Sequence, residues 1–252
     1  MLRSALRQTS RDFLDWLLPS ECLLCQAATA SNPHHVPPTL CVGCFGGLAA
    51  PAAVTCERCG ASLGPHANPS GNCPHCHGQH FRFKSVTCLG MYDGPLRSML
   101  LAGKWSSSSN NIRTLAKVYV DARATELRSL GVERIIPIPQ IWHRRLLRNF
   151  NAAAVLAGEI GKLLKRPVDA HILRRSRGTR PQKRASISDR QAIQRDTFRI
   201  RDAHVIRGER ILLVDDVLTT GATLDEAVRM LRQAGAGPCY VAVLARVSGS
   251  GG

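Results

Sequence analysis

An acidic pair and a threonine-rich turn have residue types and spacing suited to ligand binding. Asp215 and Asp216 follow an apolar run, and the turn Thr219–Thr223 leads into a helical segment. The glycine of the turn lets the backbone approach a ligand closely. Backbone N–H groups and hydroxyls at the start of a helix form a ready anion site. Because adjacent carboxylates can accept hydrogen bonds from two vicinal hydroxyls, the pattern indicates a ribose 5-phosphate ligand.

The predicted ligand-binding residues form one short stretch of the chain. They are Asp215, Asp216, Val217, Thr219, Thr220, Gly221, Ala222 and Thr223. The alternative is an ordinary strand–turn–helix in which Thr223 caps the helix. That alternative requires neither the two aspartates nor the two adjacent threonines, so the ligand site is the favoured interpretation.

Eight of the ten cysteines form a second group suited to chemistry, because they occur as four C-x2-C pairs. The pairs are Cys22/Cys25, Cys41/Cys44, Cys56/Cys59 and Cys73/Cys76. A two-residue gap directs both thiolates at one ion, and two such pairs complete the tetrahedron that Zn²⁺ prefers. Zinc is favoured over an iron–sulfur cluster or free thiols, and the expected content is about two Zn²⁺ per chain.

The spacing leaves the pairing of the cysteines open. Gaps of 15 residues in the first half and 13 in the second suit two sequential zinc ribbons. A cross-braced arrangement, in which the first and third pairs share an ion, also fits. In either case four thiolates leave no open coordination position, so the sites are structural. Cys88 and Cys239 lie outside the pattern and are expected to be buried apolar residues on strands.

The rest of the chain predicts an α/β domain. Apolar runs at 85–91, 134–138, 210–214 and 239–245 alternate with helical segments near 94–103, 112–130, 151–165 and 222–234. This alternation is typical of a parallel sheet covered by helices. Ligands on such sheets bind beyond the carboxyl ends of the strands, which is where the acidic pair and the turn lie.

The net charge of +16 is concentrated in one part of the chain. Residues 143–190 hold 13 basic and 3 acidic residues, a net charge of +10, whereas residues 1–88 hold 6 and 4, a net charge of +2. A positive field of this kind favours a phosphate-rich partner, either a phosphorylated small molecule or nucleic acid. The alternative is a solvated basic loop that contributes only to solubility.

Several of these features together resemble a known family. The run ILLVDDVLTTGATLDEA at 211–227 resembles the phosphoribosyl-pyrophosphate (PRPP) binding signature of type I phosphoribosyltransferases. With the four C-x2-C pairs upstream, the chain resembles the ComF family of DNA-uptake (competence) proteins, which includes a GntX-like branch. The similarity also covers Tyr92–Arg97, Lys104, Pro137–Pro139, Arg148 with Phe150 and Asn151, and Arg174, Thr179, Gln182, Arg190 and Phe198. The chain departs from the family pattern at Asn149, Ala152 and Ile193.

The resemblance implies a role for each part of the site. Asp215 and Asp216 are expected to bind the ribose hydroxyls, and Thr219–Thr223 the 5′-phosphate. The residues expected to face pyrophosphate are Arg144, Arg145 and Arg148. A basic loop over the site is expected to contact DNA through Arg174, Arg177, Arg180, Lys183, Arg184 and Arg190. Mg²⁺ is expected to accompany PRPP.

These observations predict four segments. They are a short amphipathic N-terminal helix at 1–21, a double zinc ribbon at 22–86, a phosphoribosyltransferase-like domain at 87–247 and a flexible tail at 248–252. No apolar run reaches the ~20 residues of a membrane span, so no stable membrane insertion and a cytoplasmic location are expected. The expected function is PRPP-linked handling of single-stranded DNA, with DNA-import proteins as further partners. The alternative is a Mg²⁺-dependent transferase that moves ribose 5-phosphate to a nucleobase-like acceptor.

Overall fold

The computed structural model describes residues 21–29, 36–50, 54–64, 68, 73–105, 109–140, 150–176 and 197–247. The chain divides into two compact units, Met1–Ala50 and Pro51–Gly252. The predicted N-terminal helix, except its last residue, and the predicted tail lie outside the described residues. The same holds for most of the predicted basic site residues, namely Arg144, Arg145, Arg148, Arg177, Arg180, Lys183, Arg184 and Arg190.

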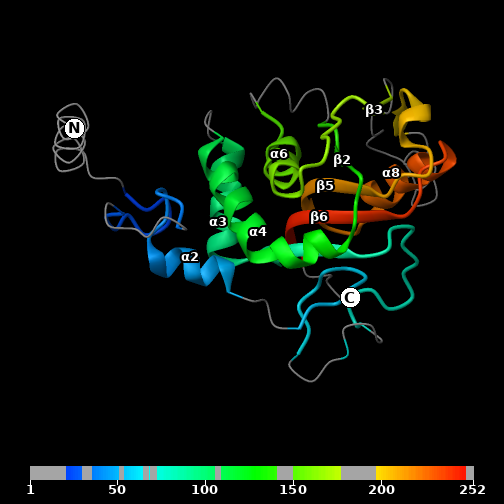
Figure 1. The fold of residues 1–252 in the computed structure, drawn as a ribbon. Helices are drawn as coiled ribbons and strands as arrows, with labels where there is room; N and C mark the ends of the chain where they lie inside the picture. Colours follow the sequence, from blue (N-terminus) through cyan, green and yellow to red (C-terminus); the bar gives the residue numbers. More distant parts are fainter. Residues whose placement is uncertain are drawn as a thin grey trace, which may run out of the picture. The chain divides into compact units, whose positions relative to one another are not determined.

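A four-stranded parallel sheet forms the centre of the second unit (Figure 1). Its strands are β1 (Val86–Met91), β2 (Arg134–Pro137), β5 (Ile211–Leu218) and β6 (Cys239–Arg246), in the order β1-β6-β5-β2. A parallel sheet is covered on both faces, so its strands are near-continuous apolar runs rather than alternating ones. The sheet confirms the predicted α/β class.

Four helices cover the two faces of this sheet. They are α3 (Gly94–Trp105), α4 (Asn110–Ser129), α6 (Ala152–Leu164) and α8 (Ala222–Gln233). α8 buries a stripe at helical spacing, made of Leu224, Ala227, Val228 and Leu231. That stripe packs in one apolar cluster with alternate residues of β5 such as Ile211 and Leu213, whereas α4 and α6 contact the strands without entering this cluster. α8 therefore lies on the face opposite α4 and α6.

Several short elements were not expected from the sequence. α2 (Val42–Ala49) belongs to the first unit. In the second unit β3 (Leu173–Arg175) pairs antiparallel with β4 (Phe198–Ile200), and a 3-10 helix, η1 (Ala203–Ile206), follows. β3 and β4 are three residues long, too short to show the alternation that identifies a strand in a sequence. They flank the basic stretch whose central residues lie outside the described part.

The strand before the acidic pair is longer than expected. The sequence places its end near Val214, but β5 continues to Leu218 and includes both aspartates. β2 pairs with β5 only as far as Pro137 opposite Val214, whereas β6 stays paired to Arg246 opposite Leu218. Among the described residues, the carboxyl half of β5 therefore has a ladder partner on one side only.

Among the helices of the described residues, none combines the length and the apolar character needed to cross a membrane.

Candidate functional site

The acidic pair lies where β5 extends past the end of β2. Asp215 is opposite Val243 of β6, and both Asp215 and Asp216 are only partly exposed. On the other side the chain leaves β2 through Ile138, whose N–H donates to the Val214 carbonyl at 2.8 Å. A crevice beyond the carboxyl ends of parallel strands is the usual ligand position in α/β sheets. The two carboxyl groups are therefore placed where such a ligand binds.

Asp215 holds its proton more tightly than an ordinary aspartate. Burial of the carboxyl and the negative charge of Asp216 raise the pKa of Asp215 from 3.8 to about 8. The backbone N–H of Asp216, which donates to Asp215 Oδ1 at 2.9 Å, and the charge of Arg175 act in the opposite direction but do not outweigh burial. A carboxyl with so strongly raised a pKa at the end of a parallel strand is a candidate for a functional site.

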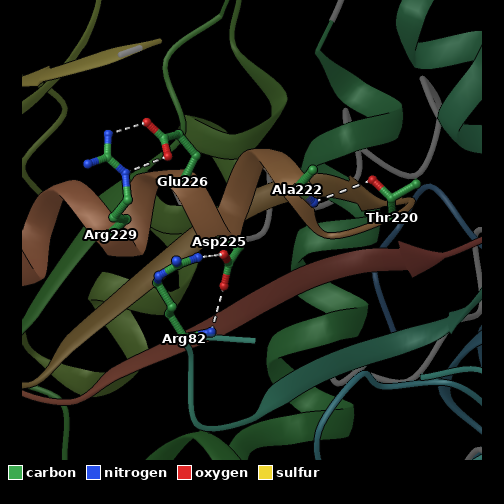
Figure 2. Close-up of polar contacts among 6 residues, drawn as sticks. All are labelled: Arg82, Thr220, Ala222, Asp225, Glu226 and Arg229. Carbon is green, nitrogen blue, oxygen red and sulfur yellow. Dashed lines mark hydrogen bonds and ion pairs between the residues drawn. The ribbon is translucent and has the colours of Figure 1, made fainter. Parts of the chain in front are cut away.

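The turn after β5 has the geometry of an anion cradle. α8 begins at Ala222, directly after Gly221, whose φ of 84° lies in the left-handed region that favours glycine. Figure 2 shows the Ala222 N–H directed at the hydroxyl of Thr220, at 3.4 Å. Thr219, Thr220 and Thr223 are exposed at this end of the helix. The turn thus presents hydroxyls next to a helix N-terminus, as the phosphate prediction requires.

A buried arginine, which the sequence did not single out, supports the turn from behind. Arg246 ends β6 with 2% of its surface exposed, and its Nη1 donates to the carbonyl oxygens of Leu218, at 3.3 Å, and of Thr219. In a trans peptide the C=O and N–H point in opposite directions. Since these carbonyls point to Arg246, the N–H groups of Thr219 and Thr220 point to the other side. Arg246 therefore orients two peptide units of the turn.

A second unexpected arginine faces the acidic pair. Arg175 of β3 donates from Nε to the Pro139 carbonyl at 2.8 Å, and its guanidinium lies 5.0 Å from the centre of the Phe198 ring. Its charge also acts on Asp215. The sequence predicted a ligand contact for the neighbouring Arg174, but Arg174 turns back to His171, with its Nη2 2.9 Å from His171 Nδ1. Successive residues of a strand point to opposite faces, which explains the difference.

The segment that leaves β2 is fixed at both ends. Asn151 accepts a hydrogen bond from the Ala153 N–H at 3.0 Å, which caps α6, and its Nδ2 donates to the Ile138 carbonyl at 3.0 Å. Gln140 Nε2 donates to the Phe150 carbonyl at 3.0 Å. These bonds tie together the described residues on either side of positions 141–149, and Arg144, Arg145 and Arg148 lie outside the described residues. Their predicted contact with pyrophosphate stays a prediction.

The eight paired cysteines form two separate clusters, in the sequential arrangement. Cys22, Cys25, Cys41 and Cys44 make one cluster, in the first unit, and Cys56, Cys59, Cys73 and Cys76 make the other, in the second unit. Within each cluster the Sγ atoms lie within 4.8 Å of one another, with separations of 3.6 Å (Cys25–Cys41) and 3.8 Å (Cys56–Cys76, Cys59–Cys73). Zn–S bonds of about 2.3 Å in a tetrahedron give sulfur–sulfur distances of about 3.8 Å.

The first C-x2-C turn of each cluster (its first knuckle, at Cys22–Cys25 or Cys56–Cys59) has the same backbone geometry. A single antiparallel bridge precedes the first cysteine, Glu21 with Ala28 in one and Thr55 with Ser62 in the other. The residue after the second cysteine has a positive φ in both, 62° at Gln26 and 69° at Gly60. The Gly60 position is crowded, because a Cβ there would lie 3.0 Å from Val86 Cγ1. Gln26 is exposed.

The thiols in each cluster differ in acidity. Burial opposes ionisation of Cys22, but hydrogen bonds from backbone N–H groups outweigh it and lower the pKa of Cys22 to about 6. In the second cluster, burial and the neighbouring charges of Cys56 and Cys73 raise the pKa of Cys59 to about 11. Four thiolates this close repel one another unless a cation lies between them. The residues therefore fit a tetrahedral Zn²⁺, which would keep all four thiolates ionised and cross-link the chain.

The two cysteines outside the pairs behave as predicted. Cys88 on β1 and Cys239 on β6 are buried, and burial raises the pKa of the Cys88 thiol to about 12 and that of Cys239 to about 11. A thiol that stays protonated is neither a metal ligand nor a nucleophile. The structure therefore gives them a packing role.

The comparisons with known proteins identify two domain families in the chain. The phosphoribosyl transferase domain matches residues 151–250, and the double zinc ribbon domain matches residues 13–77. Competence protein F of Haemophilus influenzae is 30% identical over 230 residues, which cover 89% of this chain and 96% of that protein. DNA utilization protein YhgH of Salmonella typhimurium is 27% identical over 233 residues, which cover 91% and 98%. A purine phosphoribosyltransferase structure from Pyrococcus horikoshii covers 52% of this chain and 73% of its own, with 20% identity and a TM-score of 0.35.

Together the sheet, the turn after β5 and the two cysteine clusters define a protein that joins a double zinc ribbon to a phosphoribosyltransferase-type domain. Competence protein F, which this chain matches over nearly its whole length, narrows the assignment to one family. The chain belongs to the competence protein F (ComF) family.

We predict that metal analysis finds two Zn²⁺ per chain, one for each set of four thiolates. Cys59→Ser removes a ligand of the second cluster and should lower the content to about one, whereas Cys239→Ser, outside both clusters, should leave it at two. Chelation should unfold the ribbons, because metal binding supplies their folding free energy. An iron signal, or a ribbon that keeps its fold after chelation, contradicts the assignment.

We predict that the Asp215→Asn variant has a higher free energy of unfolding than wild type, and that this difference grows as the pH rises. Because the folded-state pKa of Asp215 is raised, the folded protein binds a proton that the unfolded chain has lost, and the wild-type free energy of unfolding falls between about pH 4 and pH 8. Asparagine resembles the protonated carboxyl and lacks this loss. Denaturant titrations across that range measure the difference, with Asp121→Asn on the exposed face of α4 as control. A difference that does not change with pH contradicts the raised pKa.

We predict that Arg246→Met destabilises the second unit by about 1–3 kcal/mol, because the Thr219 carbonyl loses the donor that the buried Arg246 supplies. Leu218 is less affected, since its carbonyl also accepts from the Val247 N–H at 2.9 Å. Urea unfolding measures the change. Arg232→Met, on the exposed surface of α8, removes the same charge and should cost less than about 0.5 kcal/mol. Equal losses in the two variants would show that Arg246 does not support the turn.

Proposed function

We propose that this protein binds PRPP at the end of β5 and acts in DNA uptake by handling incoming single-stranded DNA in the cytoplasm. The observation that carries the proposal is the joint placement of the acidic pair and the threonine turn at the end of β5, past the last residue that β2 pairs. The names of the relatives, competence protein F and DNA utilization protein, support the DNA-related role.

Each part of the site has a distinct task in this proposal. Asp215 and Asp216 would bind the two ribose hydroxyls. The turn from Thr219 to Thr223 would hold the 5′-phosphate through backbone N–H groups and hydroxyls. Arg246 would keep the peptide units of the turn oriented, and Arg175, whose charge acts on Asp215, would lie toward the pyrophosphate.

The pyrophosphate carries most of the ligand's charge. Mg²⁺ bound to it would neutralise part of that charge, with few direct ligands from the protein. Arg144, Arg145 and Arg148, between Gln140 and Phe150 in the sequence, would supply the rest. The hydrogen bonds of Gln140 with Phe150 and of Asn151 with Ile138 support this role, because Ile138 also pairs with Val214, the residue before the acidic pair.

The proposed DNA contact rests on the basic stretch between β3 and β4. Residues 176–197 hold 6 basic and 2 acidic residues, a net charge of +4, and the pairing of the two short strands brings the ends of this stretch next to Pro139. Phosphate contacts from arginine and lysine give affinity without sequence preference. A role for Arg177, Arg180, Lys183 and Arg184 in DNA binding would therefore fit a protein that handles DNA of any sequence.

A second candidate is an active transferase, favoured by the match to the phosphoribosyl transferase domain. In that reaction a nitrogen base would displace pyrophosphate at C1 of the ribose, with arginines and Mg²⁺ stabilising the charge that develops. Pyrophosphate release from PRPP with a nucleobase present would establish this activity.

The PRPP proposal is tested by calorimetric titration of the full-length protein with Mg²⁺ and PRPP. Wild type should bind, and Asp216→Ala should weaken binding by about 1–3 kcal/mol, because a ribose hydroxyl loses its acceptor. Asp202→Ala, on an exposed carboxylate before η1, is the control and should bind as wild type does. Zinc content should be equal in all three. Absence of binding to wild type, or equal affinities of all three proteins, contradicts the proposed site.

The DNA proposal is tested by the salt dependence of single-stranded DNA binding. The slope of log affinity against log salt should be roughly −0.7 for each phosphate neutralised. Replacing Arg177, Arg180, Lys183 and Arg184 together with alanine should flatten the slope and lower the affinity about equally for different sequences. An unchanged slope would mean that the basic stretch does not contact DNA, and the PRPP titration would still stand.

A further inference from the structure

The second zinc ribbon continues directly into a segment that lies against the threonine turn. The segment Phe81–Phe83 begins five residues after Cys76, the last ligand of the second cluster. Phe81 packs on the apolar cluster formed by the cysteines of that ribbon and also on the main apolar cluster beneath α8. It therefore forms a physical connection between the metal cluster and the body of the domain.

The Phe81 ring lies against the glycine of the turn. A Cβ added to Gly221 would be 2.8 Å from Phe81 Cε1, a separation shorter than carbon atoms tolerate. Phe81 is stacked on Phe83, with ring centres 4.6 Å apart, and Phe83 is 5% exposed. Because a buried ring holds Phe81 in place, Phe81 limits the positions that the turn can adopt at Gly221.

Arg82 holds the first turn of α8. Its backbone N–H donates to Asp225 Oδ1 at 2.6 Å, and its guanidinium forms an ion pair with the other carboxylate oxygen (Figure 2). Asp225 itself is hydrogen bonded through its N–H to the Gly221 carbonyl at 2.8 Å. Phe81 thus contacts Gly221 and Arg82 contacts Asp225, so that two successive residues hold the chain before and after Ala222 and Thr223.

We propose that the second zinc ribbon positions the PRPP-binding turn, so that Zn²⁺ at Cys56, Cys59, Cys73 and Cys76 and PRPP at the turn strengthen each other's binding. This inference rests on the proposed function. Phe81 and Arg82 are the positioning residues, because they connect the ribbon to Gly221 and Asp225. Zinc orders the ribbon, the ribbon fixes the turn, and a turn held ready for phosphate binds it without first having to be ordered.

Positioning must be distinguished from simple electrostatic attraction. A surface pocket with a volume of about 530 Å³ is lined by Arg82, Arg229, Arg232 and Gln233. Two of its cations are compensated, Arg82 by Asp225 and Arg229 by Glu226 at 2.8 Å. Replacing Arg232 removes the same charge from the same surface as replacing Arg82. Within the described part of the chain, Arg232 makes no contact with the turn. It is therefore the matched control for Arg82.

The first experiment is the titration of full-length zinc-loaded protein with Mg²⁺ and PRPP. We expect Arg82→Ala and Phe81→Ala to weaken PRPP binding about fivefold or more, the lower end of typical coupling between two sites. We expect Arg232→Ala to bind as wild type does. Far-ultraviolet circular dichroism and zinc content show whether each variant is folded. Arg82 serves as the main variant because its side chain is 54% exposed and its loss disturbs no core.

The second experiment reads out the zinc site itself. Coupling between two binding sites is reciprocal, so saturating PRPP should slow chelator-induced release of one of the two zinc ions about fivefold. The zinc that responds should be absent from Cys59→Ser, which identifies it as the ion of the second cluster. In Arg82→Ala the release rate should no longer depend on PRPP.

The possible outcomes separate this inference from the function on which it rests. If wild type does not bind PRPP, the proposed function fails. If wild type binds but Arg82→Ala, Phe81→Ala and Arg232→Ala bind equally well, the function stands and the positioning role is wrong. If Arg82→Ala and Arg232→Ala are weakened to the same degree, charge explains the effect, and positioning is likewise wrong.

Discussion

The unequal pairing of β5 is the constraint on which the site depends. β6 follows β5 to its last residue, whereas β2 stops four residues earlier. One side of β5 is therefore held by a ladder, while beside Asp215 and Asp216 the other side has no strand partner among the described residues. The same pairing brings Arg246 opposite Leu218, where its guanidinium reaches the carbonyls of the turn. A binding site needs a rigid support, and this register provides one for the acidic pair and for the turn.

The fold and the placement of the acidic pair and the turn at the end of a strand could be predicted because they depend on local patterns. Apolar runs of strand length, a helix with a buried stripe, and an acidic pair before a glycine turn are all visible in consecutive residues. The end of β5 could not be placed, because two aspartates are poor strand formers and only the ladder with β6 keeps them extended. Sequence reasoning also missed Arg246 and Arg175. No local signal distinguishes them from the other arginines, since their roles arise from strands that meet in space.

The spacing of the cysteines predicted two sites of four thiolates but not which cysteines share an ion. Distances between Sγ atoms decide this, because only residues 22–44 and residues 56–76 bring four sulfur atoms within reach of one ion. Nor did the spacing show how the second ribbon attaches to the sheet. The Val86 N–H donates to the Glu57 carbonyl at 3.0 Å, and Ser62 N lies 3.4 Å from Met91 Sδ. The second ribbon is thus built onto β1 as part of one compact unit, and the boundary of that unit falls at Ala50.

The matching knuckles of the two ribbons are not interchangeable. Both require a left-handed residue after the second cysteine, and a glutamine meets that requirement in the first knuckle at some cost in backbone energy. At Gly60, the matching position of the second ribbon, a side chain would also have to occupy the space of Val86 and Cys88 on β1. A change of Gln26 to glycine would therefore relieve the backbone, but the reverse change at Gly60 would also crowd the side chain against Val86 and Cys88 of β1. The two copies, whatever their history, have unequal freedom to vary, and the docked one is the more constrained.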